Sequence, residues 1–186
     1  MFDPWLKRWS LVPDGAPIIT PGSRLLPVRL GDAPAMLKLV DDTDEKYGNL
    51  LMIWWDGDGA ARVLAHHEDG LLMERATGGR SLMHMAMNDE DDEASRILCN
   101  ALARLHTPRA MPAPPLLELT PWFASLRVAA AQEGGLYALS LQTAEALLAD
   151  PQEEVVLHGD MHHDNVLDFG ARGWLAIDPK RGRGER

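Results

Sequence analysis

The sequence has a single cysteine and no long apolar run, and each scarcity narrows the class of protein. Of its 186 residues only Cys99 carries a thiol, so no internal disulfide can form, which is typical of a reducing compartment. No apolar stretch approaches the length that spans a membrane. The opening segment, Met1 to Pro4, lacks the basic and then apolar pattern of a secretory signal. We therefore expect a cytoplasmic protein without a membrane partner.

Glycine-rich phosphate loops are also missing from the sequence. The segment Thr20-Pro21-Gly22-Ser23 offers one glycine, and no segment has the glycine spacing that ends in the lysine of a Walker motif. This absence argues against a P-loop nucleoside triphosphatase. A phosphate site in this chain must therefore be built from other groups.

The chain is acidic, with 28 aspartate and glutamate residues against 18 lysine and arginine residues and a net charge of −10. The last seven residues, Lys180 to Arg186, carry four basic groups and one acid, so the rest of the chain is more acidic still. Such a body repels nucleic acid and anionic membranes and attracts cationic small molecules. The alternative is that the acidity only keeps the protein soluble.

The first part of the sequence predicts strands, turns and one helix. Short apolar runs alternate with turn residues such as Pro13-Asp14-Gly15. Asp42 and Glu45 have the spacing of a helix capping box, and apolar residues recur at helical intervals from Tyr47 to Trp54. This pattern favours a five-stranded antiparallel sheet with a single helix packed on it. The two short apolar runs are 9–12 and 17–20, and the longer segments expected to form strands are 24–30, 35–40, 61–66 and 71–76.

The second part of the sequence predicts helices followed by a hairpin. Gly78-Gly79 breaks the strand pattern and is a candidate hinge. The predicted fold class is therefore α+β, with a β-rich lobe over residues 1–77 and a mainly helical lobe over residues 78–186. The expected elements of the second lobe are helices at 92–105, 120–132 and 140–149, a strand at 154–158, and a hairpin formed by 165–168 and 174–178.

Three oxygen-bearing side chains near the C-terminus are the candidate catalytic and metal-binding groups. Asp160 lies in the run His158-Gly159-Asp160, Asn165 follows five residues later, and Asp178 lies beyond the expected hairpin. The hairpin would return Asp178 to the wall of a cleft that also carries Asp160 and Asn165. Asn165 and Asp178 offer hard oxygen ligands that suit Mg²⁺, and Asp160 could orient an acceptor hydroxyl or accept its proton. Phosphoryl transfer needs such a set, because its catalysis rests on positioning and charge neutralisation.

These residues resemble the catalytic and metal-binding motifs of the aminoglycoside phosphotransferases, which are antibiotic-resistance relatives of the protein kinases. The similarity is carried by His158-Gly159-Asp160 with Asn165, and by Ile177-Asp178-Pro179. Flanking segments further resemble the streptomycin 6-kinase branch, which is grouped with the hydroxyurea-resistance kinases. These segments are Leu25 to Arg29, Pro34 to Lys38, Trp54 to Gly57, Gly59 to Val63, Leu71 to Ala76 and Asn165 to Gly170.

The resemblance implies a protein-kinase-like fold of two lobes and an enzyme that depends on ATP and Mg²⁺. The implied reaction transfers the γ-phosphate to the 6-hydroxyl of streptomycin, a cationic aminoglycoside, and confers antibiotic resistance. In this reading Asp160 is the catalytic acid residue, and Asn165 and Asp178 are the metal ligands.

The resemblance also implies a nucleotide site in the first lobe. Lys38 matches the lysine that reaches the α- and β-phosphates, and Glu45 matches the helix acid that pairs with that lysine. Met73, Glu74 and Ala76 match the hinge segment, where backbone groups would bond adenine. Each role has a plainer alternative. Lys38 would otherwise be a surface lysine, Glu45 a capping residue, and the hinge segment an ordinary buried strand end.

Two other functions compete with an active kinase. The chain stops soon after Asp178, whereas the family continues into helices that complete the larger lobe and supply much of the substrate pocket. A shortened, catalytically inactive kinase fragment is therefore one alternative. The other is a metal-dependent hydrolase, because the histidines and acids between residues 158 and 164 crowd together like a metal-binding cluster. That function would need further ligands downstream, where almost no chain remains.

Overall fold

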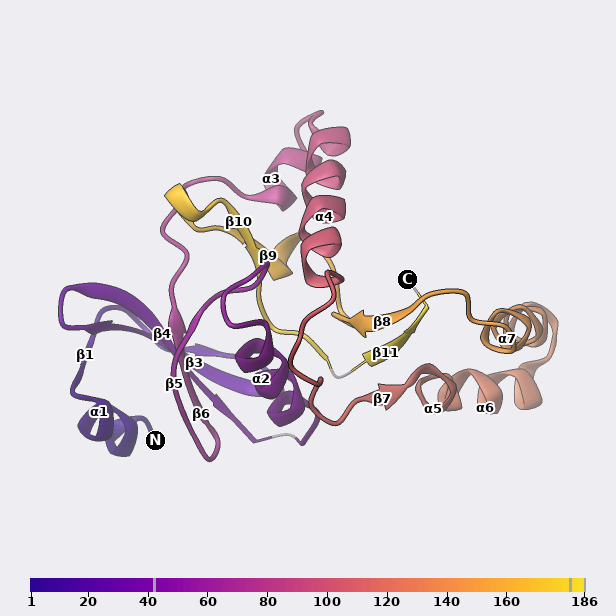
Figure 1. The fold of residues 1–186 in the computed structure, drawn as a ribbon, viewed down its shortest axis with the longest axis horizontal. Coiled ribbons are helices and arrows are strands. Elements are labelled where there is room, and N and C mark those ends of the chain that lie inside the picture. The colour runs from indigo at the N-terminus through magenta and orange to yellow at the C-terminus, as the bar shows by residue number, and fades with distance from the viewer. Residues whose placement is uncertain (42, 181, 186) are drawn as a thin grey trace.

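The computed structural model describes residues 1–41, 43–180 and 182–185, and it places a β-sheet beside a second, more open group of helices and short strands (Figure 1). The order across the sheet is β1-β3-β4-β6-β5, with β2 paired to β3, and these pairings are antiparallel. The strands of the sheet are β1 (Leu11–Pro13), β2 (Ile18–Ile19), β3 (Ser23–Leu30), β4 (Ala33–Val40), β5 (Val63–His67) and β6 (Gly70–Glu74).

Side chains on β4 alternate between the two faces of the sheet, and this alternation places Lys38. Leu37 and Leu39 are buried in an apolar cluster on one face, which the N-terminal helix α1 (Asp3–Trp9) covers. Lys38 lies between them and therefore points to the opposite face, where it meets Glu45 of α2 (Thr43–Trp55). A lysine is thus buried where the sheet, the helix and the rest of the chain converge.

The N-terminal segment differs from its prediction. Residues 3–9 form α1, whereas the sequence suggested a strand that begins at Trp9. Pro4 lies at the start of the helix, where a missing N–H costs nothing, and Trp5 and Trp9 pack one turn apart with ring centroids separated by 5.3 Å. The sheet has six strands among the described residues instead of the expected five, because the short β2 also pairs with β3. The predicted cap Asp42 lies outside the described residues.

The second region combines helices with two small sheets. The hairpin β9–β10 and the helix α4 lie close to their predicted positions. The helix expected at 120–132 is divided at Phe123, and the short elements α3, β7 and β11 were not predicted. The elements are α3 (Leu82–Ala86), α4 (Asp91–Leu105), β7 (Leu117–Glu118), α5 (Leu119–Trp122), α6 (Ala124–Glu133), α7 (Gly135–Leu148), β8 (Glu154–Leu157), the 3₁₀ turns η1 (His163–Asn165) and η2 (Gly170–Arg172), β9 (Val166–Asp168), β10 (Trp174–Ala176) and β11 (Gly182–Glu185).

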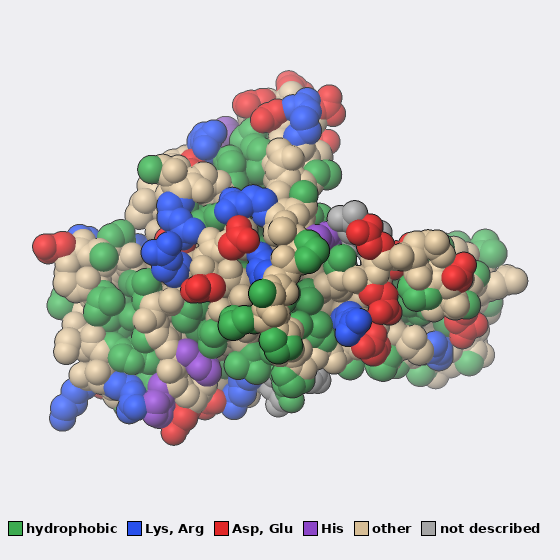
Figure 2. All heavy atoms as spheres, viewed as in Figure 1, with side chains coloured by type: hydrophobic (Ala, Val, Ile, Leu, Met, Phe, Trp, Pro, Cys, Tyr) green, Lys and Arg blue, Asp and Glu red, His purple; other side chains and the backbone are tan. Residues whose placement is uncertain are grey.

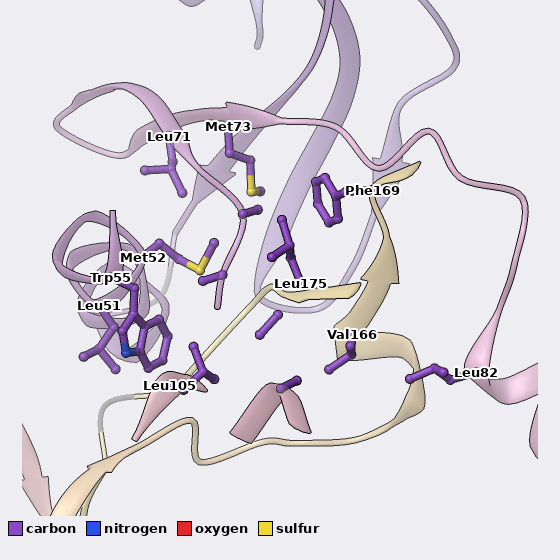
Figure 3. Packing of buried hydrophobic residues seen from close by; sticks show 14 of the residues in the cluster. Leu51, Met52, Trp55, Leu71, Met73, Leu82, Leu105, Val166, Phe169 and Leu175 are labelled. Carbon is purple, nitrogen blue, oxygen red and sulfur yellow. The ribbon is translucent and has the colours of Figure 1, made fainter. Parts of the chain in front are cut away.

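The larger apolar core joins the two regions. Figure 3 shows side chains of α2, of β6 and of the β9–β10 hairpin directed into one shared centre. Trp55, Leu105 and Leu175 are each at most 1% exposed there. Burial of each such side chain contributes about 1.5–3 kcal/mol. The sheet that carries Lys38 and the hairpin that precedes Asp178 are therefore held together as one packed unit.

Helices α6 and α7 form an arm that projects from the rest of the molecule (Figures 1 and 2). Neither helix, each described over its full length, has a buried residue, and Leu136 and Leu147 are 75% and 65% exposed. A groove of about 700 Å³ with apolar side chains such as Leu119 and Phe123 lies between the arm and β11. Within the described ranges, no helix is both long and apolar enough to cross a lipid bilayer.

Candidate functional site

An ion pair between Lys38 and Asp178 joins the sheet to the C-terminal part of the chain. The two residues lie 140 positions apart in the sequence, Lys38 on β4 and Asp178 two residues after the end of β10. Lys38 Nζ contacts Asp178 Oδ1, and only 5% of the lysine side chain is exposed. The amine predicted to bind phosphates and a predicted metal ligand therefore face each other in one place.

Glu45 completes the surroundings of the lysine. Its Oε2 accepts a hydrogen bond from Lys38 Nζ at 2.6 Å, and 12% of the glutamate side chain is exposed. The structure thus shows the two residues as an ion pair, which fixes the ammonium against the helix α2. The capping alternative for Glu45 involves Asp42, which lies outside the described residues.

A cavity of about 330 Å³ lies beside this ion pair. Lys38, Met73, Asn165 and Asp178 contribute to its walls. The tight turn 20–23 between β2 and β3 forms a further wall, in which the Ser23 N–H donates to Thr20 Oγ1 at 3.0 Å. This turn lies over Glu45, because a methyl group at residue 22 would be 3.3 Å from Glu45 Cγ. A compact turn therefore forms one wall of the cavity.

Asp178 has an unusual backbone conformation and a stabilised negative charge. Its φ is 56°, in the left-handed region that residues other than glycine seldom adopt. Burial raises the pKa of Asp178, but the charge and hydrogen bond of Lys38, with a further contribution from Lys180, outweigh burial and hold the pKa below its ordinary value. The carboxylate is therefore ionised at neutral pH, as a divalent cation requires.

Asn165 and Asp160 are linked within the loop that follows β8. Asn165 Nδ2 donates to the backbone carbonyl of Asp160 at 2.8 Å and lies 3.5 Å from Asp160 Oδ2. Because the amide nitrogen is held by the loop, Oδ1 is the Asn165 atom that remains for the cavity. Asp160 is exposed and lies outside the set of described residues that line the cavity. Its carboxylate is therefore accessible to solvent beside the cavity residue Asn165.

His158 fixes the loop that carries Asp160. Its ring is 1% exposed and stacks on Trp55, with centroids 6.2 Å apart and planes inclined by 12°. The Asp160 N–H donates to Nδ1 at 3.3 Å, so the proton resides on Nε2, which donates to the Ile177 carbonyl at 2.8 Å. Burial lowers the pKa of His158, and the hydrogen bond to Ile177 offsets this only in part. A neutral imidazole therefore ties the Asp160 loop to the residue before Asp178.

The close approach of α2 to the segment after Asp178 depends on Gly48. A methyl group at this position would overlap the carbonyl oxygen of Pro179. Glu45 lies one turn earlier on the same helix. Because residue 48 has no side chain, α2 approaches Pro179 closely, and Glu45 and Asp178 can therefore lie in the same site.

The predicted hinge residues are divided. Met73 lines the cavity. The side chain of Glu74 contacts the Arg172 guanidinium and accepts a hydrogen bond from the Arg62 N–H at 2.5 Å. Ala76 packs against the larger apolar core. Of the described residues, neither Glu74 nor Ala76 lines the cavity, so a contact of this segment with adenine stays a prediction.

Lys180 is a site residue that sequence reasoning did not select. Its Nζ contacts Glu45 Oε1 and lies 3.8 Å from Asp178 Oδ2. Burial lowers the pKa of Lys180, but the hydrogen bond to Glu45 and the charge of Asp178 outweigh burial and raise the pKa above its ordinary value. The signal in the sequence is a lysine two positions after the aspartate that was predicted to bind the metal.

The donor atoms of the cavity fit a magnesium ion. Asp178 supplies a carboxylate and Asn165 an amide oxygen; both are hard ligands, and both residues line the cavity. Magnesium sites in nucleotide enzymes use few protein ligands, because phosphate oxygens and water complete the coordination. Two protein ligands next to a buried lysine are therefore sufficient for a magnesium nucleotide.

The histidines and acids between residues 158 and 164 do not form a comparable metal site. In the part of the chain that the structure describes, no three His, Cys, Asp or Glu side chains are grouped so as to hold a metal ion. Both ring nitrogens of His158 are hydrogen-bonded, one to the Asp160 N–H and the other to the Ile177 carbonyl, and His162 Nδ1 accepts a hydrogen bond from the Asp164 N–H at 3.3 Å. The geometry therefore gives no support to a metal-dependent hydrolase.

Known proteins resemble the chain over nearly its full length. The family model described as aminoglycoside/hydroxyurea antibiotic resistance kinase matches residues 8–186. The chain is 52% identical over 181 residues to the streptomycin 3''-kinase of Klebsiella pneumoniae, a match that covers 97% of this chain and 68% of that protein. It is 34% identical over 198 residues to the streptomycin 6-kinase of Streptomyces griseus, with 94% and 59% covered. The chain thus spans about six tenths to two thirds of the length of these curated relatives.

The fold also has counterparts among solved structures. A choline/ethanolamine kinase family protein from Mesorhizobium loti matches with a TM-score of 0.63 and 17% sequence identity, over 97% of this chain and 65% of that chain. At this identity the likeness concerns the fold, which is α+β and protein-kinase-like, as the sequence predicted.

Proposed function

Because the chain belongs to the aminoglycoside/hydroxyurea antibiotic resistance kinase family, we propose that it transfers the γ-phosphate of ATP to a hydroxyl group of an aminoglycoside. The observation that carries this proposal is the contact of Lys38 with Asp178 beside Asn165, at one cavity. An amine, a carboxylate and an amide oxygen are the groups that hold a magnesium nucleotide in kinases. Phosphorylation of the drug would confer resistance, and ATP as donor suits a cytoplasmic enzyme.

The residues around the cavity take distinct roles in this proposal. Lys38 would hold the α- and β-phosphates, and Glu45 would orient its ammonium through the hydrogen bond of 2.6 Å. Asp178 and Asn165 would hold Mg²⁺, which supplies neutralising charge for the phosphates. Met73, the predicted hinge residue that lines the cavity, would lie against adenine.

Asp160 would act on the acceptor hydroxyl. Its carboxylate is exposed, while its backbone is fixed by the buried His158 and by the Asn165 amide. A fixed carboxylate open to solvent can orient an incoming hydroxyl and accept its proton. The net charge of −10 further favours a polycationic substrate, because an acidic surface raises the local concentration of cations.

We propose streptomycin as the aminoglycoside, and two of its hydroxyls compete as the acceptor. The flanking motifs predicted the 6-hydroxyl, whereas the higher identity, 52% against 34%, is to the protein named a 3''-kinase. We therefore favour the 3''-hydroxyl, with the 6-hydroxyl as the alternative. Phosphorus–proton correlation NMR of the product identifies the modified position directly.

The reaction itself is tested with purified chain, ATP, MgCl₂ and streptomycin, with ADP release as the readout. Asp160→Asn should lower the rate by about 100-fold or more, as expected for loss of a general base. Asp164→Asn is the matched control, because Asp164 is also exposed, lies in the same loop and undergoes the same change of charge. Equal rates for the two variants would remove Asp160 from the mechanism.

A chain that binds nucleotide without transferring phosphate is the second candidate function. The exposed apolar arm favours it, because α6 and α7 bury no residue in the described structure. The same assay separates the two functions. Nucleotide binding together with ADP release that is no faster than in Asp160→Asn would select the second candidate.

A further inference from the structure

Four charged side chains form a closed ring at the edge of the cavity. Lys38 contacts Glu45 Oε2 and Asp178 Oδ1, while Lys180 contacts Glu45 Oε1 and lies 3.8 Å from Asp178 Oδ2. Each carboxylate therefore divides its two oxygens between two lysines, and the formal charges of the ring cancel. Two members come from the first region of the fold and two from the segment after β10, so the ring also bridges the two regions.

The backbone of Lys180 is anchored, but its ammonium is not enclosed. The Lys180 N–H donates to the His158 carbonyl at 2.7 Å, and a methyl group at Gly159 would lie 3.1 Å from Lys180 Cβ. The Lys180 side chain is 23% exposed, whereas the Lys38 side chain is 5% exposed. Lys180 is therefore the member of the ring that can turn toward the cavity without leaving its place in the chain.

The ring of four charges opposes the binding of a metal ion alone but does not oppose the binding of a polyphosphate. A divalent cation that approaches Asp178 meets a carboxylate already paired with two ammonium groups, and it must displace one of them against charge repulsion. A polyphosphate instead offers oxygens to the lysines, so an ammonium that turns away from a carboxylate keeps an anionic partner. The phosphate thereby frees the Asp178 oxygen that the metal ion needs.

We propose that Lys180 is a second phosphate-binding lysine that, in the empty site, blocks the metal-binding oxygen of Asp178. This inference rests on the proposed function, because a magnesium nucleotide must enter the cavity. It makes metal binding conditional on nucleotide, and it adds a second cationic group to the site.

The test measures the two ligands separately on Lys180→Met. The affinity for the ATP analogue AMP-PNP without metal, followed by calorimetry, should fall by about tenfold or more, the value of a lost charge-assisted hydrogen bond. The affinity for Mn²⁺ without nucleotide, followed by electron paramagnetic resonance, should rise by about two- to fivefold, because a competing ion pair is gone. A role of Lys180 in folding would lower both affinities.

Lys46→Met is the matched control. Lys46 follows Glu45 on α2, its side chain is 45% exposed, and it pairs with Asp69 at 2.7 Å on the outside of the site. This variant has the same change of charge and should leave both affinities within about twofold, as expected of an exposed ion pair. Lys180→Arg, which keeps the positive charge, should restore AMP-PNP binding, and Lys180→Gln offers a second neutral variant if the methionine variant fails to fold.

The outcomes separate this inference from the proposed function. If wild-type protein binds AMP-PNP and the neutral Lys180 variants bind it equally well, or if they lose affinity for Mn²⁺ as well, the role of Lys180 is overturned and the proposed function stands. If wild-type protein binds no AMP-PNP, the proposed function fails, and this inference fails with it.

Discussion

Replacement of Gly48 by alanine should destabilise the protein, although alanine is the better helix residue. Gly48 lies inside α2, where propensity by itself predicts a gain of about 1 kcal/mol. The added methyl group would overlap the Pro179 carbonyl oxygen and lie 3.3 Å from the carbonyl carbon. These are backbone atoms, which cannot rotate out of the way as a side chain can. The helix and the segment after Asp178 must therefore move apart.

The expected changes in stability and in activity can both be estimated from this overlap. Overpacking of this kind costs about 1–3 kcal/mol, so the net change after the propensity gain is a destabilisation of about 0–2 kcal/mol. The site should suffer more, because the same movement separates Glu45 from Lys180. A displacement of about 1 Å at a catalytic constellation can lower activity by about 100-fold. We therefore expect kcat/KM to fall far more than the free energy of unfolding suggests.

Urea denaturation followed by tryptophan fluorescence gives the stability, and ADP release gives kcat/KM. Gly79→Ala is the control, because a methyl group there meets no atom within 4 Å and its backbone is not in the positive-φ region. This control should be neutral or stabilising by up to about 1 kcal/mol. A Gly48→Ala variant that gains about 1 kcal/mol and keeps full activity would refute the close packing of α2 on Pro179.

Two further predictions concern buried titratable groups. Below the ordinary pKa of 6.5 the unfolded chain binds a proton that the buried His158 resists, so the free energy of unfolding should fall as the pH drops from about 7 to 5. His158→Asn should remove that part of the slope in urea titrations, and an unchanged slope would contradict the neutral imidazole. Asp168→Asn should cost about 1–3 kcal/mol, because Asp168 accepts hydrogen bonds from Arg80 Nε at 2.9 Å and from the Gly170 N–H at 3.0 Å. The hydrogen bond from Arg80 holds the pKa of Asp168 below its ordinary value, so the wild type should lose this contribution as the pH falls below 3.8. An acid unfolding curve that the substitution leaves unchanged would contradict that role.

The parts of the fold that the sequence predicted are those that local pattern controls. The hairpin β3–β4 follows from two apolar runs around a turn, and α4 follows from a 3.6-residue apolar period. The elements that were missed depend on distant partners or are very short. β11 exists as a strand because it pairs with β7 and β8, and its own residues, Gly182–Glu185, have no strand pattern. α1 is a short helix whose last residue, Trp9, was predicted to begin a strand.

The residues of the site also differ in how far the sequence could predict them. Asp160, Asn165 and Asp178 lie close together in the sequence and could be recognised from their spacing and chemistry. Lys38 and Glu45 were placed by resemblance, and the structure shows them in contact. The hinge role of Glu74, which concerns its backbone, stays a prediction, and its side chain pairs with Arg172, a partner 98 residues away that no motif indicates.

The sequence by itself identified residues that could hold a phosphate and a metal ion, because those residues have the spacing expected of a short loop followed by a hairpin. Only the tertiary structure decided that Lys180 reaches Glu45, 135 residues earlier, and closes a ring with Lys38 and Asp178. The physical reason is that this contact depends on the packing of α2 against Pro179, where Gly48 leaves room for a backbone carbonyl. Periodicity and motif spacing describe neighbours along the chain, whereas packing brings together groups that the chain separates.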